Sequence, residues 1–351
     1  MGGNALSEVN THRLDRAEYL TICDEVLAQL RHNILRHNIS RRIVDIPAYR
    51  NKESFGDLDI LLETFSGDNI DYRSLIIVLF APKQIVQNNN CYSFDYKDFQ
   101  IDLILTPTTE FNTTLSYFSW NDLGNLAGRI FKKLGFKYGH RGLSYLFRED
   151  DLSHTVYAET IVSQDIQQIM AFGGLDYDKF IQGFDTIDDM FVWISSSKYF
   201  HKDIYLFHNR NHISRTRDKK RKNYHLFLEW CANTPNLNAY PWTEMREQDG
   251  YAGKPEFLEL ARKQFDGFAA EYDCIVGKHN EHKIFREKFN GNIVCELTGL
   301  TGKDLGMFMQ HMTKIHGGKE SMFEEMWFLE QVDIIAMILD AYGSYYVSSE
   351  L

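Results

Sequence analysis

Three aspartates lie in two short apolar segments of the chain, Asp57 and Asp59 in residues 54–62 and Asp102 in residues 99–105. Successive side chains of a strand point to opposite faces, so Asp57 and Asp59 project together while Leu58, Ile60 and Leu62 point the other way into a core. If Asp102 comes from a neighbouring strand, the three carboxylates converge. Such a cluster repels itself unless divalent cations neutralise it, and hard oxygen ligands suit Mg²⁺. The three aspartates are therefore candidate ligands of a magnesium site.

The surrounding sequence predicts the elements that would position these aspartates. Apolar residues at helical spacing indicate an amphipathic helix over 14–34, and a short strand is expected over 42–46. The continuous apolar run 75–80 is typical of a strand buried on both faces. The asparagines at 88–90 indicate a hairpin turn before a strand over 91–96. We expect an α+β fold in which a small mixed β-sheet is backed by helices.

The rest of the chain is predicted to be mostly helical. A helical stripe follows from residue 116 and ends near Gly135, and a strand pair is expected at 143–147 and 155–162. At 351 residues, the chain exceeds one typical domain. The expected organisation has three parts: a catalytic domain over 1–150, a mixed, largely helical middle domain over 151–285 and a helical C-terminal domain over 286–351.

Composition restricts the class of protein. The formal net charge of −11 argues against binding nucleic acid by overall charge, so any polyanion must meet a local basic patch. The five cysteines are scattered and form no Cys-x-x-Cys pair, which argues against disulfides and cysteine-rich zinc sites. No apolar tract reaches the length of a membrane span, about 18 residues. We expect a cytoplasmic protein without a membrane segment.

The densest basic region of this acidic chain covers residues 208–224. It is the candidate for contact with a phosphate backbone, and a solvated basic loop without a partner is the alternative. The candidate RNA-binding residues are Arg210, Arg215, Arg217, Lys219, Lys220, Arg221 and Lys222.

The segment Gly56-Asp57-Leu58-Asp59-Ile60-Leu61, followed by the apolar-flanked Asp102, resembles the nucleotidyltransferase superfamily typified by DNA polymerase beta. Members of this superfamily carry a helix, a Gly-Ser turn, a strand with Asp-x-Asp and a third aspartate on a later strand. A weaker likeness, over residues 289–294 and 300–308, is to the tail of CCA-adding enzymes and poly(A) polymerases. The resemblance is closest in character to these template-independent RNA nucleotidyltransferases, and it leaves the segment from about 150 to 287 unmatched.

The resemblance implies transfer of a nucleoside monophosphate from a nucleoside triphosphate, such as ATP, to an acceptor hydroxyl, with release of pyrophosphate. It implies a nucleotidyltransferase core and a two-metal mechanism with two Mg²⁺ ions. Asp57 and Asp59 would bind both ions, and Asp102 would bind one and help deprotonate the acceptor. The implied acceptor is an RNA, possibly the 3′ end of a tRNA.

One element of the superfamily pattern differs here, because the position of the Gly-Ser turn reads Ile46-Pro47-Ala48-Tyr49-Arg50. The triphosphate must then be bound by other groups, and a helix N-terminus after the third aspartate could contribute. The candidates are Arg50, Lys52, Ser54 and Gly56, together with Ser119 or Asn121, for which simple helix capping is the alternative. The difference leaves two other functions open: nucleotidyl transfer to a protein or small molecule, and a catalytically silent module that binds nucleotide or RNA.

Overall fold

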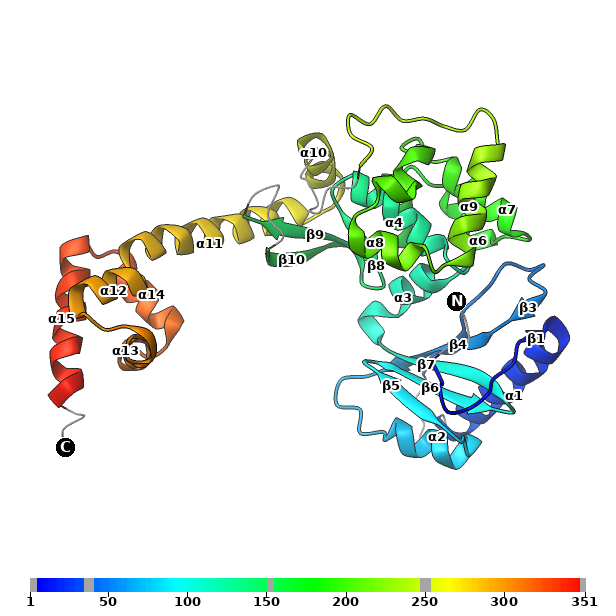
Figure 1. Ribbon diagram of the computed structural model, residues 1–351, viewed down its shortest axis with the longest axis horizontal. Coiled ribbons are helices and arrows are strands. Elements are labelled where there is room, and N and C mark those ends of the chain that lie inside the picture. The colour runs from blue at the N-terminus through cyan, green and yellow to red at the C-terminus, as the bar shows by residue number, and fades with distance from the viewer. Residues whose placement is uncertain (1–4, 35–40, 150–154, 247–253, 348–351) are drawn as a thin grey trace. The chain divides into compact units, whose positions relative to one another are not determined.

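The computed structural model describes residues 5–34, 41–149, 155–246 and 254–347. The chain divides into two compact units, Met1–Phe268 and Ala269–Leu351 (Figure 1). The expected domain boundary at 150/151 lies outside the described residues. The boundary expected at 285/286 lies inside the helix α11 (Phe268–Lys288). The three-domain division therefore stays a prediction, and each unit is described by itself.

A five-stranded mixed sheet forms the centre of the first unit, with strand order β2-β4-β7-β6-β5. Its strands are β2 (Ile43–Asp45), β4 (Asp57–Thr64), β5 (Ile85–Asn88), β6 (Cys91–Tyr96) and β7 (Phe99–Pro107). The central pair β4 and β7 is parallel, and the other neighbours are antiparallel. The expected small mixed sheet is confirmed, as is the hairpin between β5 and β6.

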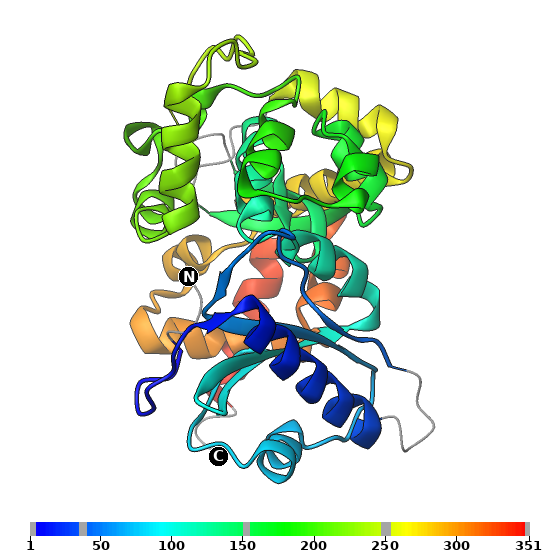
Figure 2. The same ribbon diagram turned by 90° about the vertical axis from the view of Figure 1, so that its right-hand side faces the viewer.

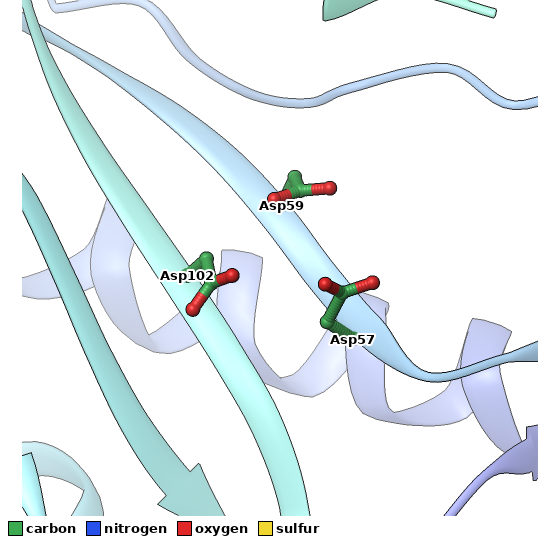
Figure 3. A group of neighbouring side chains, drawn as sticks. All are labelled: Asp57, Asp59 and Asp102. Atoms are coloured by element: carbon green, nitrogen blue, oxygen red, sulfur yellow. The ribbon is translucent and has the colours of Figure 1, made fainter. Parts of the chain in front are cut away.

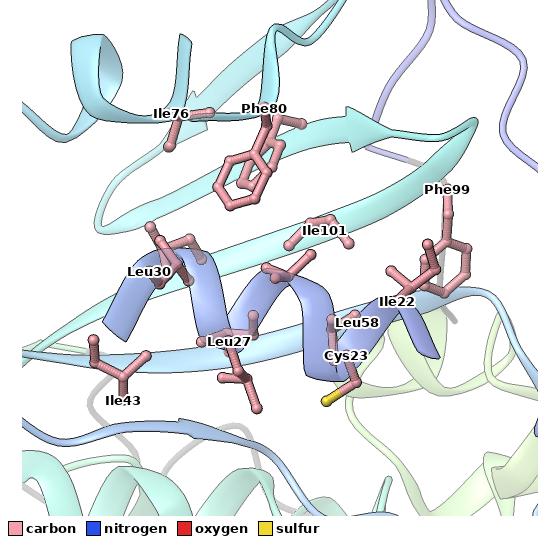
Figure 4. Packing of buried hydrophobic residues seen from close by; sticks show 14 of the residues in the cluster. Ile22, Cys23, Leu27, Leu30, Ile43, Leu58, Ile76, Phe80, Phe99 and Ile101 are labelled. Atoms are coloured by element: carbon pink, nitrogen blue, oxygen red, sulfur yellow. The ribbon is translucent and has the colours of Figure 1, made fainter. Parts of the chain in front are cut away.

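One face of this sheet is covered by α1 (Arg16–Ile34) and α2 (Tyr72–Phe80), whose apolar side chains pack with those of β4, β6 and β7 (Figure 4). Leu58, Ile60 and Leu62 belong to this core and are fully buried. Because strand side chains alternate, Asp57 and Asp59 must point to the opposite face. There, α3 (Phe111–Phe118) places Phe111 against Leu61.

The apolar run 75–80 belongs to helix α2, so the expectation of a strand there is wrong. Asp71 begins the helix, since its carboxylate accepts the backbone N–H of Ser74 at 3.1 Å. Phe80 is buried, whereas Val78 is 79% exposed. A continuous apolar run has no period that separates a buried strand from a helix, and here the helix packs only one side against the sheet.

The remaining elements of the first unit form two small sheets and further helices (Figure 2). The strands are β1 (Leu14–Asp15) paired with β3 (Ser54–Phe55), and β8 (Lys137–Gly139), β9 (Gly142–Arg148) and β10 (Val156–Ser163). Pairing of β9 with β10 confirms the strand pair expected from the sequence. The α-helices are α4 (Leu123–Lys133), α5 (Ile166–Phe172), α6 (Tyr177–Gln182), α7 (Ile187–Ser195), α8 (His212–Asp218), α9 (Lys222–Asn233) and α10 (Pro255–Gln264). Short 3₁₀ turns are η2 (Thr108–Glu110), η3 (Lys202–Tyr205) and η4 (Phe207–Asn209).

The second unit is helical, as expected for the C-terminal region. After α11 it contains α12 (Gly291–Thr298), α13 (Gly302–Ile315), α14 (Lys319–Trp327) and α15 (Gln331–Val347). Phe308, Met312, Met326, Ile334 and Ile338 form the fully buried part of its core. None of the helices that the structure describes has both the length and the apolar composition to cross a bilayer.

Candidate metal centre

The three aspartates meet on one face of the parallel pair β4 and β7 (Figure 3). Asp59 lies opposite Asp102 in the strand register, and Asp57 lies opposite Gln100. Asp57 is two residues from Asp59 and therefore shares its face. One carboxylate oxygen from each aspartate lies within 4.8 Å of the other two. The convergence expected from the sequence is confirmed.

Burial and mutual repulsion make this cluster costly when all three groups are ionised. Burial is the largest cause that raises the pKa of Asp59 well above its ordinary value, and the charges of Asp57 and Asp102 raise it further. The charge of Lys52 acts in the opposite direction. A divalent cation would offset the same repulsion, and carboxylate oxygens are ligands that Mg²⁺ prefers. The donor set therefore fits a magnesium centre.

Asp102 is held by hydrogen bonds as well as by its position. Burial raises the pKa of its carboxyl to about 6, and the charge of Asp57 adds to this, while hydrogen bonds from Ser93 and Gln100 lower it. The Gln100 Nε2 amide donates to both Asp102 oxygens, at 2.9 and 3.0 Å. Sequence reasoning missed Gln100. The available signal was a polar residue two positions before Asp102 in an otherwise apolar strand.

Among the residues expected to bind the triphosphate, Lys52 is the one whose charge lowers the pKa of Asp59. Burial lowers the pKa of Lys52, and the charges of Asp57 and Asp59 raise it. Its ammonium lies 4.5 Å from the centre of the Phe55 ring, where the π-face favours a cation. Lys52 is thus a cation held beside the acidic cluster.

Arg50, Ser54 and Gly56 are placed by other parts of the first unit. The Arg50 guanidinium pairs with Asp185 at 2.7 Å, and its backbone N–H donates to the carbonyl of Phe184 at 2.9 Å. The Ser54 hydroxyl accepts from Arg13 Nε at 2.9 Å. Gly56 is buried at the junction of β3 and β4. Arg50 therefore ties the segment before β3 to the segment before α7.

Ser119 and Asn121 lie in the turn between α3 and α4. The Ser119 hydroxyl donates to the Leu115 carbonyl at 2.6 Å, which completes the end of α3. Asn121 has a φ of 58°, and its buried Oδ1 has no hydrogen-bond partner among the described residues. The charge of the neighbouring Asp122 contributes, after those of Asp57 and Asp59, to raising the pKa of Lys52. The amide oxygen of Asn121 therefore remains open to a donor, whereas both donors of Ser119 are used at the end of α3.

Three of the seven candidate cations of the basic region form internal ion pairs. Asp218 is fully buried, and its carboxylate lies 3.5 Å from Arg210 Nε and 3.4 Å from Arg217 Nε. Arg129, on α4, pairs with the same carboxylate at 3.1 Å. Arg221 pairs instead with Asp122. These contacts dock α8 and the start of α9 against α4 and leave Arg210 buried.

The remaining cations of this region differ in exposure. The side chains of Lys219, Lys220 and Lys222 are exposed, whereas Arg215 is half-buried. These four residues are the part of the basic run that stays outside the Asp218 and Asp122 ion pairs.

No family model matches this sequence, and no curated protein matches it significantly. Among solved structures, the chain is similar to Leishmania infantum polymerase beta in a ternary P/T complex, with 13% identity and a TM-score of 0.33 over 40% of this chain and 60% of that one. A ternary gap complex of the same polymerase gives 13% identity and a TM-score of 0.32 over 39% and 53% of the two chains. The chain thus spans between about half and 60% of these structures. Similarity at this level leaves its family open, so the site geometry must support any functional conclusion.

Proposed function

We propose that this chain is a Mg²⁺-dependent nucleotidyltransferase that transfers a nucleoside monophosphate from a nucleoside triphosphate to an acceptor hydroxyl and releases pyrophosphate. The observation that carries the proposal is the convergence of Asp57, Asp59 and Asp102 on one face of two parallel strands. Three carboxylates that repel one another when empty are suited to hold divalent cations against a polyphosphate.

The proposed mechanism assigns a role to each aspartate. Asp57 and Asp59 would hold both Mg²⁺ ions, and Asp102 would hold one of them. When bound, the metal ions would stabilise the attacking and leaving oxygens of an in-line displacement. Asp102 would also accept the proton of the acceptor hydroxyl or orient that hydroxyl. The protein's contribution is positioning and charge neutralisation, without a covalent intermediate.

The groups around Lys52 are proposed to receive the triphosphate. Lys52 supplies a cation next to the aspartates, and Asn121, in the turn before α4, would donate through its side-chain amide nitrogen. Ser54 and Gly56 would contribute through their backbone, whereas the backbone N–H and the hydroxyl of Ser119 both donate to the Leu115 carbonyl. Arg50 is committed to Asp185, so we assign it the role of holding the segment that carries Lys52.

RNA, possibly a tRNA 3′ end, is proposed as the acceptor. Within the basic region, the residues proposed to contact the RNA phosphates are now Arg215, Lys219, Lys220 and Lys222, because the other candidate cations form internal ion pairs. Binding through so few charges predicts a modest salt dependence of the affinity for RNA.

The proposal is tested by incubating the purified protein with each of four α-labelled nucleoside triphosphates and with total RNA or tRNA lacking its terminal nucleotides. We expect Mg²⁺-dependent incorporation of label into RNA. Asp57→Asn should abolish it, while Asp45→Asn, at an exposed carboxylate on β2, should retain it. Unchanged transfer by Asp57→Asn would refute the metal assignment. Label on a protein instead would overturn the RNA acceptor, and nucleotide binding without transfer would indicate a silent module.

A further inference from the structure

Gln100 is a buried polar residue whose side-chain amide is hydrogen-bonded through both its nitrogen and its oxygen. Its side chain lies on β7, two positions before Asp102 and on the same face, and the residue is 2% exposed. Its amide nitrogen donates to both oxygens of Asp102. Its amide oxygen accepts the backbone N–H of Ala5 at 2.9 Å.

These partners determine the orientation of the amide. An ionised carboxylate only accepts hydrogen bonds, so the Gln100 atom that faces Asp102 must be the NH₂ group. The backbone N–H of Ala5 only donates, so the atom that faces Ala5 must be the carbonyl oxygen. Rotating the amide by 180° would place oxygen against carboxylate and NH₂ against N–H, which loses both interactions. The bond to Ala5 therefore favours the orientation that serves Asp102.

A second glutamine, Gln84, accepts a backbone N–H from the same N-terminal segment, but away from the three aspartates. Gln84 Oε1 accepts the backbone N–H of Glu8 at 2.9 Å. The backbone N–H of His12 donates to the carbonyl of Asp98 at 3.0 Å, so several contacts fasten the segment 5–13 to this end of the sheet. Gln84 and Gln100 thus hold the same segment, but only Gln100 reaches the acidic cluster.

We propose that Gln100 is a positioning residue for the metal centre and that the segment around Ala5 sets its orientation. This inference rests on the proposed function. Gln100 holds the Asp102 carboxylate at the place where it meets the carboxylates of Asp57 and Asp59. Groups that orient a metal ligand in this way typically change metal affinity or activity by about 10–100-fold when they are removed.

The test measures Mn²⁺ binding to the full-length protein by calorimetry, well below the unfolding temperature, together with the Mg²⁺ concentration that gives half-maximal transfer. Gln100→Met keeps the length of the side chain and removes the amide, and we expect the Kd for Mn²⁺ to rise about tenfold. Ala5→Pro removes the donor that orients Gln100, and we expect about a threefold rise. Both variants should recover transfer at high Mg²⁺, which a general loss of structure would not allow.

The matched controls are Gln84→Met and Glu8→Pro, which break the equivalent contact away from the aspartates and should leave the Kd unchanged. Wild-type affinity in both Gln100→Met and Ala5→Pro would overturn the inference. If Gln100→Met does not fold, Ala5→Pro decides, because Ala5 is exposed. Asp102→Asn distinguishes a failure of the metal centre from a failure of the role given to Gln100. If this variant also binds Mn²⁺ like the wild type, the metal centre itself is refuted. If it loses binding while Gln100→Met and Ala5→Pro do not, only the role of Gln100 fails.

Discussion

Replacing Asp102 by asparagine is expected to stabilise the metal-free protein at pH 7. Burial, followed by the charge of Asp57, raises the pKa of this carboxyl from 3.8 to about 6 despite two stabilising hydrogen bonds. A shift of this size corresponds to about 3 kcal/mol against the ionised form in the folded state. Because the folded pKa is the higher one, the cost is fully present above pH 6 and disappears as the pH falls below 3.8. Asparagine keeps an oxygen that can accept from Gln100 and carries no charge.

The assay is thermal unfolding in EDTA, where we expect Asp102→Asn to melt about 6–10 °C above the wild type at pH 7. The difference should shrink toward pH 4, where the wild-type carboxyl is itself protonated. Saturating Mg²⁺ should reverse the order, because only the wild type gains stability from binding. Asp95→Asn is the matched control: Asp95 is 4% exposed on β6 and accepts the Gln84 N–H at 2.8 Å, outside the cluster. A metal-free Asp102→Asn variant that melts at or below the wild-type temperature at pH 7 would refute the reasoning.

Two further predictions concern ion pairs outside the metal centre. Hydrogen bonding to Arg42 holds the pKa of the Glu63 carboxyl at about 2, below its ordinary 4.5, so the stability it contributes is present above pH 4.5 and lost as the pH falls through 2. Urea unfolding of Glu63→Gln should show a deficit of about 1–2 kcal/mol at pH 7 that narrows toward pH 2, and a deficit independent of pH would contradict this assignment. Asp218→Asn removes the buried counterion of Arg129 and Arg210 and should lower the free energy of unfolding by about 3–5 kcal/mol, measured by denaturant titration. An unchanged denaturation midpoint would show that these arginines are not held by that charge.

The acidic face was predictable because it depends on local alternation. Asp57 and Asp59 are separated by one residue, and the strict alternation with Leu58 and Ile60 determines which side chains enter the core. Asp102 could be added because a strand with apolar flanks has the same two faces. The strand register then placed it opposite Asp59, as a shared metal site requires.

What the sequence did not reveal depends on partners far away along the chain. A cluster of basic residues predicts either contact with a phosphate backbone or a solvated loop, yet Arg221 pairs with Asp122, 99 residues earlier. The role of Gln100 depends on Ala5, 95 residues before it. The composition of the run 75–80 suits a strand as well as a helix, and only the N-cap Asp71 and the packing on one side identify it as a helix.

The parallel pairing of β4 with β7 also has a consequence for biosynthesis. Strand β7 can pair with β4 only after α2 and the β5–β6 hairpin have been synthesised. The carboxylate opposite Asp59 therefore comes from Asp102, more than 40 positions downstream. Non-local contacts of this kind form late and slow the folding of a sheet. A nascent chain on the ribosome that ends before Phe99 therefore lacks the third carboxylate of the proposed metal site, and the three-aspartate cluster exists only once β7 has joined the sheet.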